Sequence, residues 1–356
     1  MGVKIRKILD IEIGKGTTKE KLIKKIDFSD LKGKCVTVDA ANVIYQFLSI
    51  IQPTTGLPLM DSKKRITSHL SGLFYRNINL IEKEIKPIYV FDGKPPKLKS
   101  KTIQERRKTR EEAYKQWKVA IEEGDVEAAR KYGQAAHRMT SDIIKESKEL
   151  LDAMGIPVIQ AVTEGEAQAT FMVGKNNVWA VASQDFDSVL FGAPRLVRNL
   201  SLAERRRLPR TNQYIRVEPE LLISSEIYEN LKISREQLID IGILIGTDFN
   251  EGIKGVGAKT ALKLIKNYKD LKTIIKEKSY EFNRTYEELE EIKNFFLNPD
   301  IIEDYKIEFK RPNPNLIRKI LIDEFEFGQE RVEKGIKRLE KMFATKQQKS
   351  LEKWFK

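Results

Sequence analysis

The chain has 356 residues, enough for one large core or two domains, and its 65 Lys and Arg residues outnumber its 52 Asp and Glu residues to give a net charge of +13. A single cysteine excludes an intramolecular disulfide, two histidines argue against a Cys/His zinc site, and no apolar run is long enough to span a membrane. We therefore expect a cytoplasmic protein with a polyanionic partner.

Two short runs in the first hundred residues are predicted to be buried strands. Residues 36–38 and 88–91 are apolar, and each run ends directly in an acidic residue, Asp39 and Asp92. An Asp after a strand is also common in turns, so neither acid by itself indicates a site.

Two helices are predicted around these strands. Residues 40–51 carry Tyr45, and residues 66–86 have the apolar spacing of an amphipathic helix that also carries Arg76. The arginine is either a solvated charge or a contact to phosphate.

A strongly basic run follows the second strand. Residues 97–118 include Lys99 and Arg106 and contain few acids. Such a run is usually a solvated helix, but this one leaves directly from an acidic strand end, which favours an element that follows a phosphate backbone. Residues 126–154 show helical apolar spacing typical of ordinary packing.

An acidic pair, Glu164 and Glu166, opens a helix predicted over 164–173. One alternative is that Thr163 and Glu166 form a capping box, which would explain Glu166 without chemistry. Both glutamates can point inward only if Glu164 lies before the first full turn, because positions i and i+2 do not share a helix face.

A third predicted strand, residues 178–182, leads to a second acidic pair, Asp185 and Asp187. A helix predicted over 235–245 ends near a seventh acid, Asp248. Parallel strands place their carboxyl ends at one sheet edge, so these acids are expected in one pocket. Clustered carboxylates repel one another and stay ionised only beside a cation, for which Mg²⁺ or Mn²⁺ is the natural partner of an oxygen-only site.

Residues 252–260 nearly mimic a phosphate-binding P-loop, but Ala258 separates the last glycine from Lys259 and a helix precedes the segment. We therefore reject nucleotide binding. Gly255 and Gly257 instead suit a turn between two helices whose backbone approaches a phosphate without reading sequence. The alternative is a simple helix–helix turn.

Residues 277–343 favour charged helices, with a break at the Pro-Asn-Pro of 312–314. The polar end of the chain then spaces four side chains like one helical turn: Gln348, Leu351, Trp354 and Phe355. They either fold back on the body or anchor a partner's pocket.

Several of these motifs together resemble the flap endonucleases of the structure-specific 5′ nuclease superfamily, and the archaeal members in particular. The resemblance covers nearly the whole chain and rests on residues 38–42 (Val-Asp-Ala-Ala-Asn), 89–96 (Tyr-Val-Phe-Asp-Gly-Lys-Pro-Pro), 163–167 (Thr-Glu-Gly-Glu-Ala), 185–187 (Asp-Phe-Asp), 246–249 (Gly-Thr-Asp-Phe) and the hairpin at 252–260.

The resemblance implies a site that cuts phosphodiester bonds with two Mg²⁺ or Mn²⁺ ions. Its metal-binding carboxylates would be Asp39, Asp92, Glu164, Glu166, Asp185, Asp187 and Asp248. Lys99 and Arg106 match basic residues at the foot of a helical arch, and Tyr45 and Arg76 match contacts to DNA. Gly255, Gly257 and Lys259 match a duplex-binding hairpin that also binds K⁺, although Gly252 stands where some members have a hydroxyl residue.

The resemblance also implies an α/β fold, with a central, mostly parallel sheet flanked by helices as in PIN-like nuclease cores. It divides a single nuclease domain, residues 1–343, into a nuclease part (1–96), a helical arch (97–150), an internal nuclease part (151–230), a helix-hairpin-helix DNA-binding region (231–275) and C-terminal helices (276–343). Residues 344–356 would form a flexible tail that binds the sliding clamp PCNA.

The expected function is therefore cleavage of 5′ flaps in branched DNA, with 5′–3′ exonuclease activity, by a monomer acting in Okazaki-fragment maturation and DNA repair. A non-catalytic DNA-binding module would be favoured by missing carboxylates, and none is missing. A nuclease for gaps, bubbles, nicks or Holliday junctions stays open, although the predicted arch is short and carries no long insertion.

Overall fold

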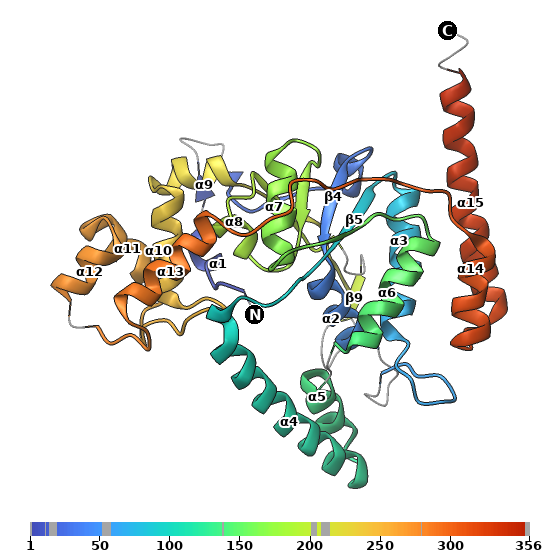
Figure 1. The fold of residues 1–356 in the computed structure, drawn as a ribbon, viewed down its shortest axis with the longest axis horizontal. Coiled ribbons are helices and arrows are strands. Elements are labelled where there is room, and N and C mark those ends of the chain that lie inside the picture. Colours follow the sequence, from blue (N-terminus) through green and yellow to red (C-terminus); the bar gives the residue numbers. More distant parts are fainter. Residues whose placement is uncertain are drawn as a thin grey trace.

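The computed structural model describes residues 2–10, 12–13, 20–51, 58–136, 139–200, 205–207, 214–278 and 280–352, with side chains up to Phe343. Within these ranges the core of the protein is a seven-stranded sheet (Figure 1). Its strands, in spatial order, are β3 (Lys24–Lys25), β11 (Glu220–Ile223), β8 (Arg195–Arg198), β7 (Ala180–Ala182), β4 (Cys35–Asp39), β5 (Lys86–Phe91) and β6 (Val158–Gln160).

Strands β8, β7, β4, β5 and β6 run parallel, and in the described sheet β11 alone runs in the opposite direction, pairing antiparallel with β8 on one side and with the edge strand β3 on the other. The predicted α/β class with a mostly parallel sheet is thus confirmed. The pleat of β5 explains the layers, because successive side chains point to opposite faces: Ile88 and Val90 enter one core, and Tyr89 and Phe91 enter the other.

Helices cover both faces of the sheet (Figure 1). One core is formed with α1 (Arg6–Leu9), α7 (Gly165–Gly174), α8 (Asp187–Leu190), α9 (Ser224–Leu231), α10 (Arg235–Ile245), α11 (Ala258–Tyr268), α12 (Leu271–Glu277) and α13 (Tyr286–Leu297). The other is formed with α2 (Ala40–Ile50), α3 (Ser68–Glu82), α6 (Ser141–Ala153), α14 (Pro314–Arg318), the short π-helix η3 (Lys319–Glu324) and α15 (Gln329–Glu352).

Two helices project from this body as an arch. The single-turn η2 (Lys97–Lys99) leads into α4 (Ser100–Glu122), which packs against α5 (Val126–Ala136) (Figure 1). Helix α5 returns toward α2, and α6 then packs on α3 in the body. The basic run predicted from residue 97 is therefore a helix that starts at the sheet edge and leaves the core.

The segment between α13 and α14 differs from the predicted run of helices. Residues 298–313 cross the body in an extended conformation. The amide of Gln168 in α7 bonds both backbone groups of Ile302, and the backbone N–H of Lys310 donates to Gly155 O at 3.0 Å. These long-range bonds replace helical ones, and Asn313 then caps α14, which begins at Pro314.

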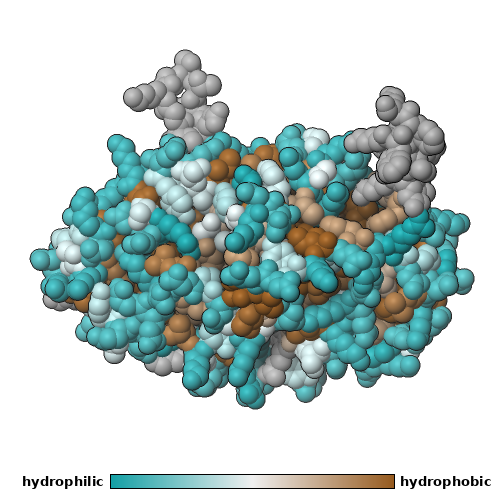
Figure 2. All heavy atoms as spheres, turned by 45° about the horizontal axis from the view of Figure 1, so that its top comes forward, coloured by the Kyte–Doolittle hydropathy of each residue, from teal (hydrophilic) through white to brown (hydrophobic). Residues whose placement is uncertain are grey.

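Small pairings outside the sheet complete the described structure. They are β1 (Glu12–Ile13) with β2 (Glu20–Lys21), β9 (Arg205–Arg207) with β10 (Tyr214–Arg216), and the 3₁₀ turn η1 (Phe28–Leu31). Hydrophilic side chains cover most of the face in Figure 2, with apolar atoms in scattered patches. None of the described helices is long and apolar enough to cross a membrane.

Candidate active site

The carboxyl ends of three neighbouring strands supply the centre of the site. Strands β7, β4 and β5 are adjacent in the sheet. Asp39 is the last residue of β4 and also caps α2 by accepting a bond from Asn42 N at 3.0 Å, while Asp92 directly follows β5. Asp187 starts α8, after the turn that follows β7. Parallel strands therefore bring these acids to one edge, as predicted.

The start of α7 adds the two glutamates. Glu164 is the N-cap of this helix and Glu166 lies in its first turn, so Glu164 does precede the helical face. Glu166 Oε1 accepts bonds from the hydroxyls of Ser183 at 2.8 Å and Ser188 at 3.1 Å, whereas the hydroxyl of Thr163 has no hydrogen-bond partner in the described structure. The capping-box alternative for Thr163 and Glu166 is therefore wrong.

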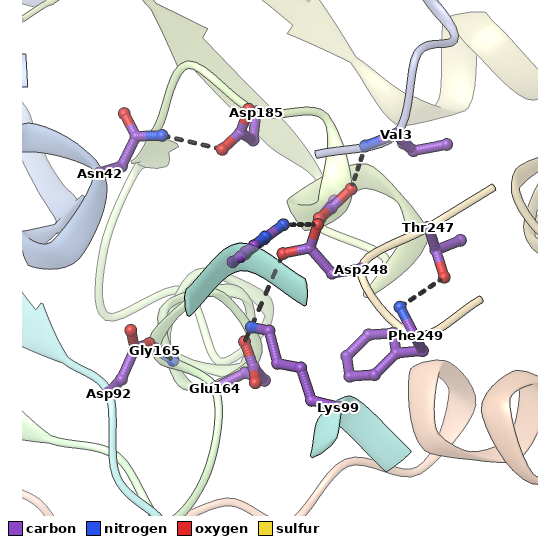
Figure 3. A network of polar contacts seen from close by, with 12 residues as sticks. Val3, Asn42, Asp92, Lys99, Glu164, Gly165, Asp185, Thr247, Asp248 and Phe249 are labelled. Carbon is purple, nitrogen blue, oxygen red and sulfur yellow. Dashed lines mark hydrogen bonds and ion pairs between the residues drawn. The ribbon is translucent and has the colours of Figure 1, made fainter. Parts of the chain in front are cut away.

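Two cations enter the site from the base of the arch. Lys99 Nζ lies 2.8 Å from Glu164 Oε2 and 3.7 Å from Asp248 Oδ2, so it bridges acids that are 84 residues apart in sequence, as Figure 3 shows. Arg106, on the next turns of α4, pairs with the other oxygen of Asp248. Asp248 lies two residues after Gly246, the C-cap of α10, where the chain turns away from the helix. The φ of Gly246 is +98°, a conformation that favours glycine.

Burial and like charges strongly perturb the acids. Loss of hydration raises the pKa of Asp39 to about 8, with repulsion from Asp92 as the next cause, and it raises the pKa of Asp187 to about 7, with repulsion from Asp248 next. Burial also raises the pKa of Glu166, with repulsion from Asp187 as the next cause. The pKa of Glu164 is raised by burial as well, against the favourable charge of Lys99.

All seven predicted acids belong to one electrostatic cluster. Asp39 interacts with Asp92, Asp185 and Glu164, Glu166 interacts with Asp187, and Asp187 interacts with Asp248. For Lys99, burial opposes the charged form, but the surrounding carboxylates outweigh it and raise its pKa. The sequence prediction that these acids converge is thus met by the folded chain.

The donor chemistry of this cluster fits hard divalent cations, because every side chain offers carboxylate oxygens and the repulsion among them favours a counter-ion. As the side chains stand, however, no three Asp, Glu, His or Cys residues in the described ranges are arranged tightly enough to hold one ion. Lys99 and Arg106 already pair with Glu164 and Asp248, and Gly165 N donates to Asp92 Oδ1 at 2.7 Å.

Several groups that position the acids were not predicted. Asn42 Nδ2 donates to Asp185 Oδ2 at 2.9 Å (Figure 3). Ser183 Oγ accepts a bond from Asp185 N at 3.2 Å. Val3 N donates to Asp187 Oδ1 at 2.7 Å, which ties the N-terminal segment to the site. Asn42 lies in a motif that carried the resemblance, so sequence could have found it, but a backbone N–H 184 residues away leaves no sequence signal.

The expected DNA contacts lie outside the carboxylate cluster. Tyr45 is half-buried on α2, with the guanidinium of Arg110 on the arch 5.2 Å from its ring centroid. Arg76 on α3 lines a small cavity together with Asn42 and Ser183, the two residues that bond Asp185. Sequence reasoning did not single out Arg110, because the pairing depends on how α4 leans over α2.

The hairpin residues occupy an exposed turn between α10 and α11. Gly255 has a φ of +84°, Gly257 precedes α11 as its N-cap without a side-chain cap, and Lys259 is exposed in the first turn. A Cβ at Gly252 would lie 2.1 Å from the carbonyl carbon of Ile245, so this turn has no room for a side chain there. Because Gly257 provides no side-chain cap, the first backbone N–H groups of α11 are open to an anion.

The predicted clamp-binding residues are only partly covered by the structure. Gln348 and Leu351 lie on the last turns of α15, where the backbone is helical and the side chains are not described. Trp354 and Phe355 lie outside the described residues. Their role stays a prediction.

The chain matches two family models, the XPG N-terminal domain over residues 13–113 and the XPG I-region over residues 155–248. It is 50% identical to flap endonuclease 1 of Pyrococcus furiosus over 334 residues, covering 94% of this chain and 96% of that protein. It is 46% identical to flap endonuclease 1 of Aeropyrum pernix over 360 residues, covering 100% of both chains.

The fold leads to the same group of proteins. The solved structure of flap endonuclease-1 from Methanococcus jannaschii matches with a TM-score of 0.72 and 42% identity, over 91% of this chain and 97% of that one. A cluster of acids at the carboxyl ends of a parallel sheet, with Lys99 and Arg106 delivered from an arch, is thus accompanied by high identity over almost the full length. The chain belongs to the flap endonuclease 1 family.

Proposed function

We propose that this chain is a structure-specific 5′ flap endonuclease, a metal-dependent hydrolase of phosphodiester bonds at junctions between single-stranded and double-stranded DNA. The observation that carries the proposal is the cluster of seven acids from separate segments, with two cations from the arch inserted between them. A basic chain of net charge +13 surrounds this acidic site, which supports a polyanionic substrate held over bound cations.

The acids would hold two divalent ions, Mg²⁺ or Mn²⁺. These acids are Asp39, Asp92, Glu164, Glu166, Asp185, Asp187 and Asp248. Bound divalent ions supply a water of lowered pKa and stabilise the oxygens of an in-line displacement. Asn42, Ser183 and Val3 N would keep the carboxylates aimed through the bonds that they already make.

Lys99 and Arg106 would stabilise the negative charge that grows on the phosphate in the transition state. In the DNA-free protein they pair with Glu164 and Asp248. A phosphate and its cations would replace these pairings, because each carboxylate gains a dication and each basic side chain gains a phosphate oxygen. The pairs would therefore compensate part of the negative charge of the site until substrate arrives.

The surrounding elements would bind the branched substrate. Tyr45 would stack on a base beside the cut once Arg110 moves off its ring, and Arg76 would contact a nearby phosphate. Gly255, Gly257 and Lys259 would bind the duplex backbone behind the junction through the open N–H groups of α11. K⁺ at this hairpin would have to rely on backbone carbonyls, since Gly252 supplies no hydroxyl.

The test of the function is Asp185→Asn assayed on a labelled 5′ flap with Mg²⁺. We expect cleavage to fall by at least about 100-fold while flap binding in Ca²⁺ is kept, because the amide preserves shape but removes the charge that a cation needs. Asp152→Asn, an exposed change on α6 that removes the same charge, is the matched control. Retained turnover of Asp185→Asn would defeat the proposal. Parallel rates on flap, bubble, nick and four-way substrates measure the preference.

The cellular role follows from the substrate. A 5′ flap nuclease with 5′–3′ exonuclease activity would process Okazaki fragments and repair intermediates in the cytoplasm, as a monomer recruited by PCNA. The recruiting residues would be Gln348, Leu351, Trp354 and Phe355 at the end of the chain. Co-elution of the full chain with PCNA, and its loss when the last nine residues are removed, would test this role.

A further inference from the structure

Arg284 is a buried arginine that no motif of the sequence singled out. It lies just before α13, beyond the two regions matched by the family models, residues 13–113 and 155–248. Its side chain is only 7% exposed. A buried guanidinium is costly unless it is hydrogen-bonded, so its partners indicate what the residue does.

One nitrogen of Arg284 joins the two segments that carry catalytic candidates. Nη2 donates to Leu98 O at 3.0 Å and to Phe249 O at 3.0 Å. Leu98 immediately precedes Lys99, and Phe249 immediately follows Asp248. Nη1 is held by Glu288 Oε1 at 2.9 Å, which anchors the guanidinium to α13.

The same two segments also contact each other through the side chains of Lys99 and Phe249. The ring of Phe249 packs edge-on against Phe295 and Phe296 of α13, with centroids 5.1 and 5.4 Å apart. The ammonium of Lys99 lies 5.7 Å from the centroid of the Phe249 ring, on its way to Glu164 and Asp248 (Figure 3). Helix α13 therefore packs against the segment that follows Asp248, and Lys99 contacts that same segment through the ring of Phe249.

Arg284 is not placed to contact a phosphate itself. Nε is buried without a hydrogen-bond partner in the described structure, and the two terminal nitrogens are engaged by a carboxylate and two carbonyls. Any effect on chemistry must therefore pass through the backbone of residues 98 and 249. Neither carbonyl belongs to a strand of the sheet, so the sheet does not fix their spacing. The guanidinium of Arg284 links the two segments directly by bonding both carbonyls.

We propose that Arg284 is a positioning residue, which sets the spacing between Lys99 and Asp248 by bonding the carbonyls next to them. The proposal rests on the catalytic and metal-binding roles proposed for Lys99 and Asp248. Arg284→Lys keeps the charge, but an ammonium lacks the planar fork that reaches both carbonyls and Glu288 together. The segments carrying Lys99 and Asp248 would then shift relative to each other.

The experiment measures the single-turnover rate of flap cleavage at saturating enzyme and, separately, the Kd for the flap in Ca²⁺. For Arg284→Lys we expect a rate loss on the order of 10-fold with an unchanged Kd, since small displacements of catalytic groups slow chemistry without removing substrate contacts. Arg284→Met should lose more. Thermal unfolding of each variant verifies that the compared proteins are folded at the assay temperature.

Arg318→Lys is the control. The guanidinium of Arg318 bonds Glu333 Oε1 at 2.6 Å and Asn315 Oδ1 at 3.1 Å, so it joins α14 to α15, away from the proposed catalytic residues. This variant should leave the cleavage rate unchanged. An equal rate loss in both variants would reduce Arg284 to a general stabiliser and overturn the proposal.

A double-mutant cycle separates this inference from the proposed function. If Arg284 acts through Lys99, Arg284→Lys should have little further effect in a Lys99→Met background. Full additivity would overturn the positioning role, as would an unchanged rate in Arg284→Lys alone. Lys99→Met without any loss of rate would instead defeat the proposed role of Lys99, and the positioning role with it.

Discussion

The carboxylate site and the hairpin between α10 and α11, which we propose to hold the same DNA substrate, are built by opposite physical means. In the site, Asp39 and Asp187 are buried, and their pKa values are raised to about 8 and about 7. The hairpin is exposed and made of glycines, with Gly255 and Gly257 leaving backbone N–H groups open. A site that assists a reaction needs buried charged side chains, whereas a contact that only binds a duplex can use backbone N–H groups.

This difference predicts how each region responds to substitution. In the site, replacing a single charged group should change the cleavage rate strongly, because fixed charges act strongly where water is excluded. In the hairpin, one side chain should alter affinity modestly and evenly across DNA sequences.

Lys99→Met should have the largest effect among the basic residues. Removing a cation that reaches Glu164 and Asp248 should reduce the single-turnover cleavage rate by about 100-fold to 1000-fold, with a small change in flap affinity. The measurement is quench-flow cleavage of a labelled flap with Mg²⁺. Lys148→Met, a partly buried lysine on α6 that bonds Gln160, is the control. A similar loss in both variants would contradict a specific role.

The raised pKa values predict how pH and Mg²⁺ affect stability. Asp39 and Asp187 have pKa values of about 8 and about 7 when folded, against an ordinary value of 3.8, so the folded state holds their protons more tightly. In EDTA the free energy of unfolding should therefore fall as pH rises from about 4 to about 8. Mg²⁺ replaces these protons, so its stabilisation should be larger at pH 8 than at pH 6.

Thermal unfolding at both pH values, with EDTA and with Mg²⁺, tests this expectation. Asp39→Asn should flatten the pH dependence in EDTA, because the neutral amide carries no titrating charge. A shift by Mg²⁺ that is the same at pH 6 and pH 8 would show that the acids do not exchange protons for the cation.

Lys259→Gln should have a smaller effect, confined to binding. Loss of one exposed phosphate contact at the start of α11 should weaken flap binding about threefold and reduce the salt slope of log K by about 1, with the single-turnover rate unchanged. Fluorescence anisotropy at several salt concentrations measures both quantities. Lys334→Gln on α15, paired with Glu330 at the opposite end of the molecule in Figure 1, should leave the slope unchanged.

Phe355→Ala should have no effect on cleavage in the absence of the clamp. It should weaken binding to PCNA, because an aromatic anchor at a terminus contributes mainly by filling a partner's pocket. Calorimetry with PCNA and a clamp-free cleavage assay distinguish the two activities. Equal loss of both would indicate that the end of the chain is part of the folded body.

The two regions also differ in how far sequence reasoning could reach. The acids at residues 39, 92, 185 and 187 follow short apolar runs, so a local pattern located them, and α10 was predicted with its observed bounds. The hairpin glycines were visible for the same reason. Residues 298–311 were predicted as helical, yet they form no helix, since bonds to Gln168 and Gly155 outweigh local propensity.

The sequence by itself determined the strands, the acids at their ends and the glycine turn, because each depends on neighbours a few residues away. Only the tertiary structure decided that Val3 N bonds Asp187 and that Arg284 lies between the carbonyls of Leu98 and Phe249. The reason is that backbone carbonyls and N–H groups are the same at every residue. A bond to one of them across a hundred or more residues is specified by packing and leaves no pattern in the chain.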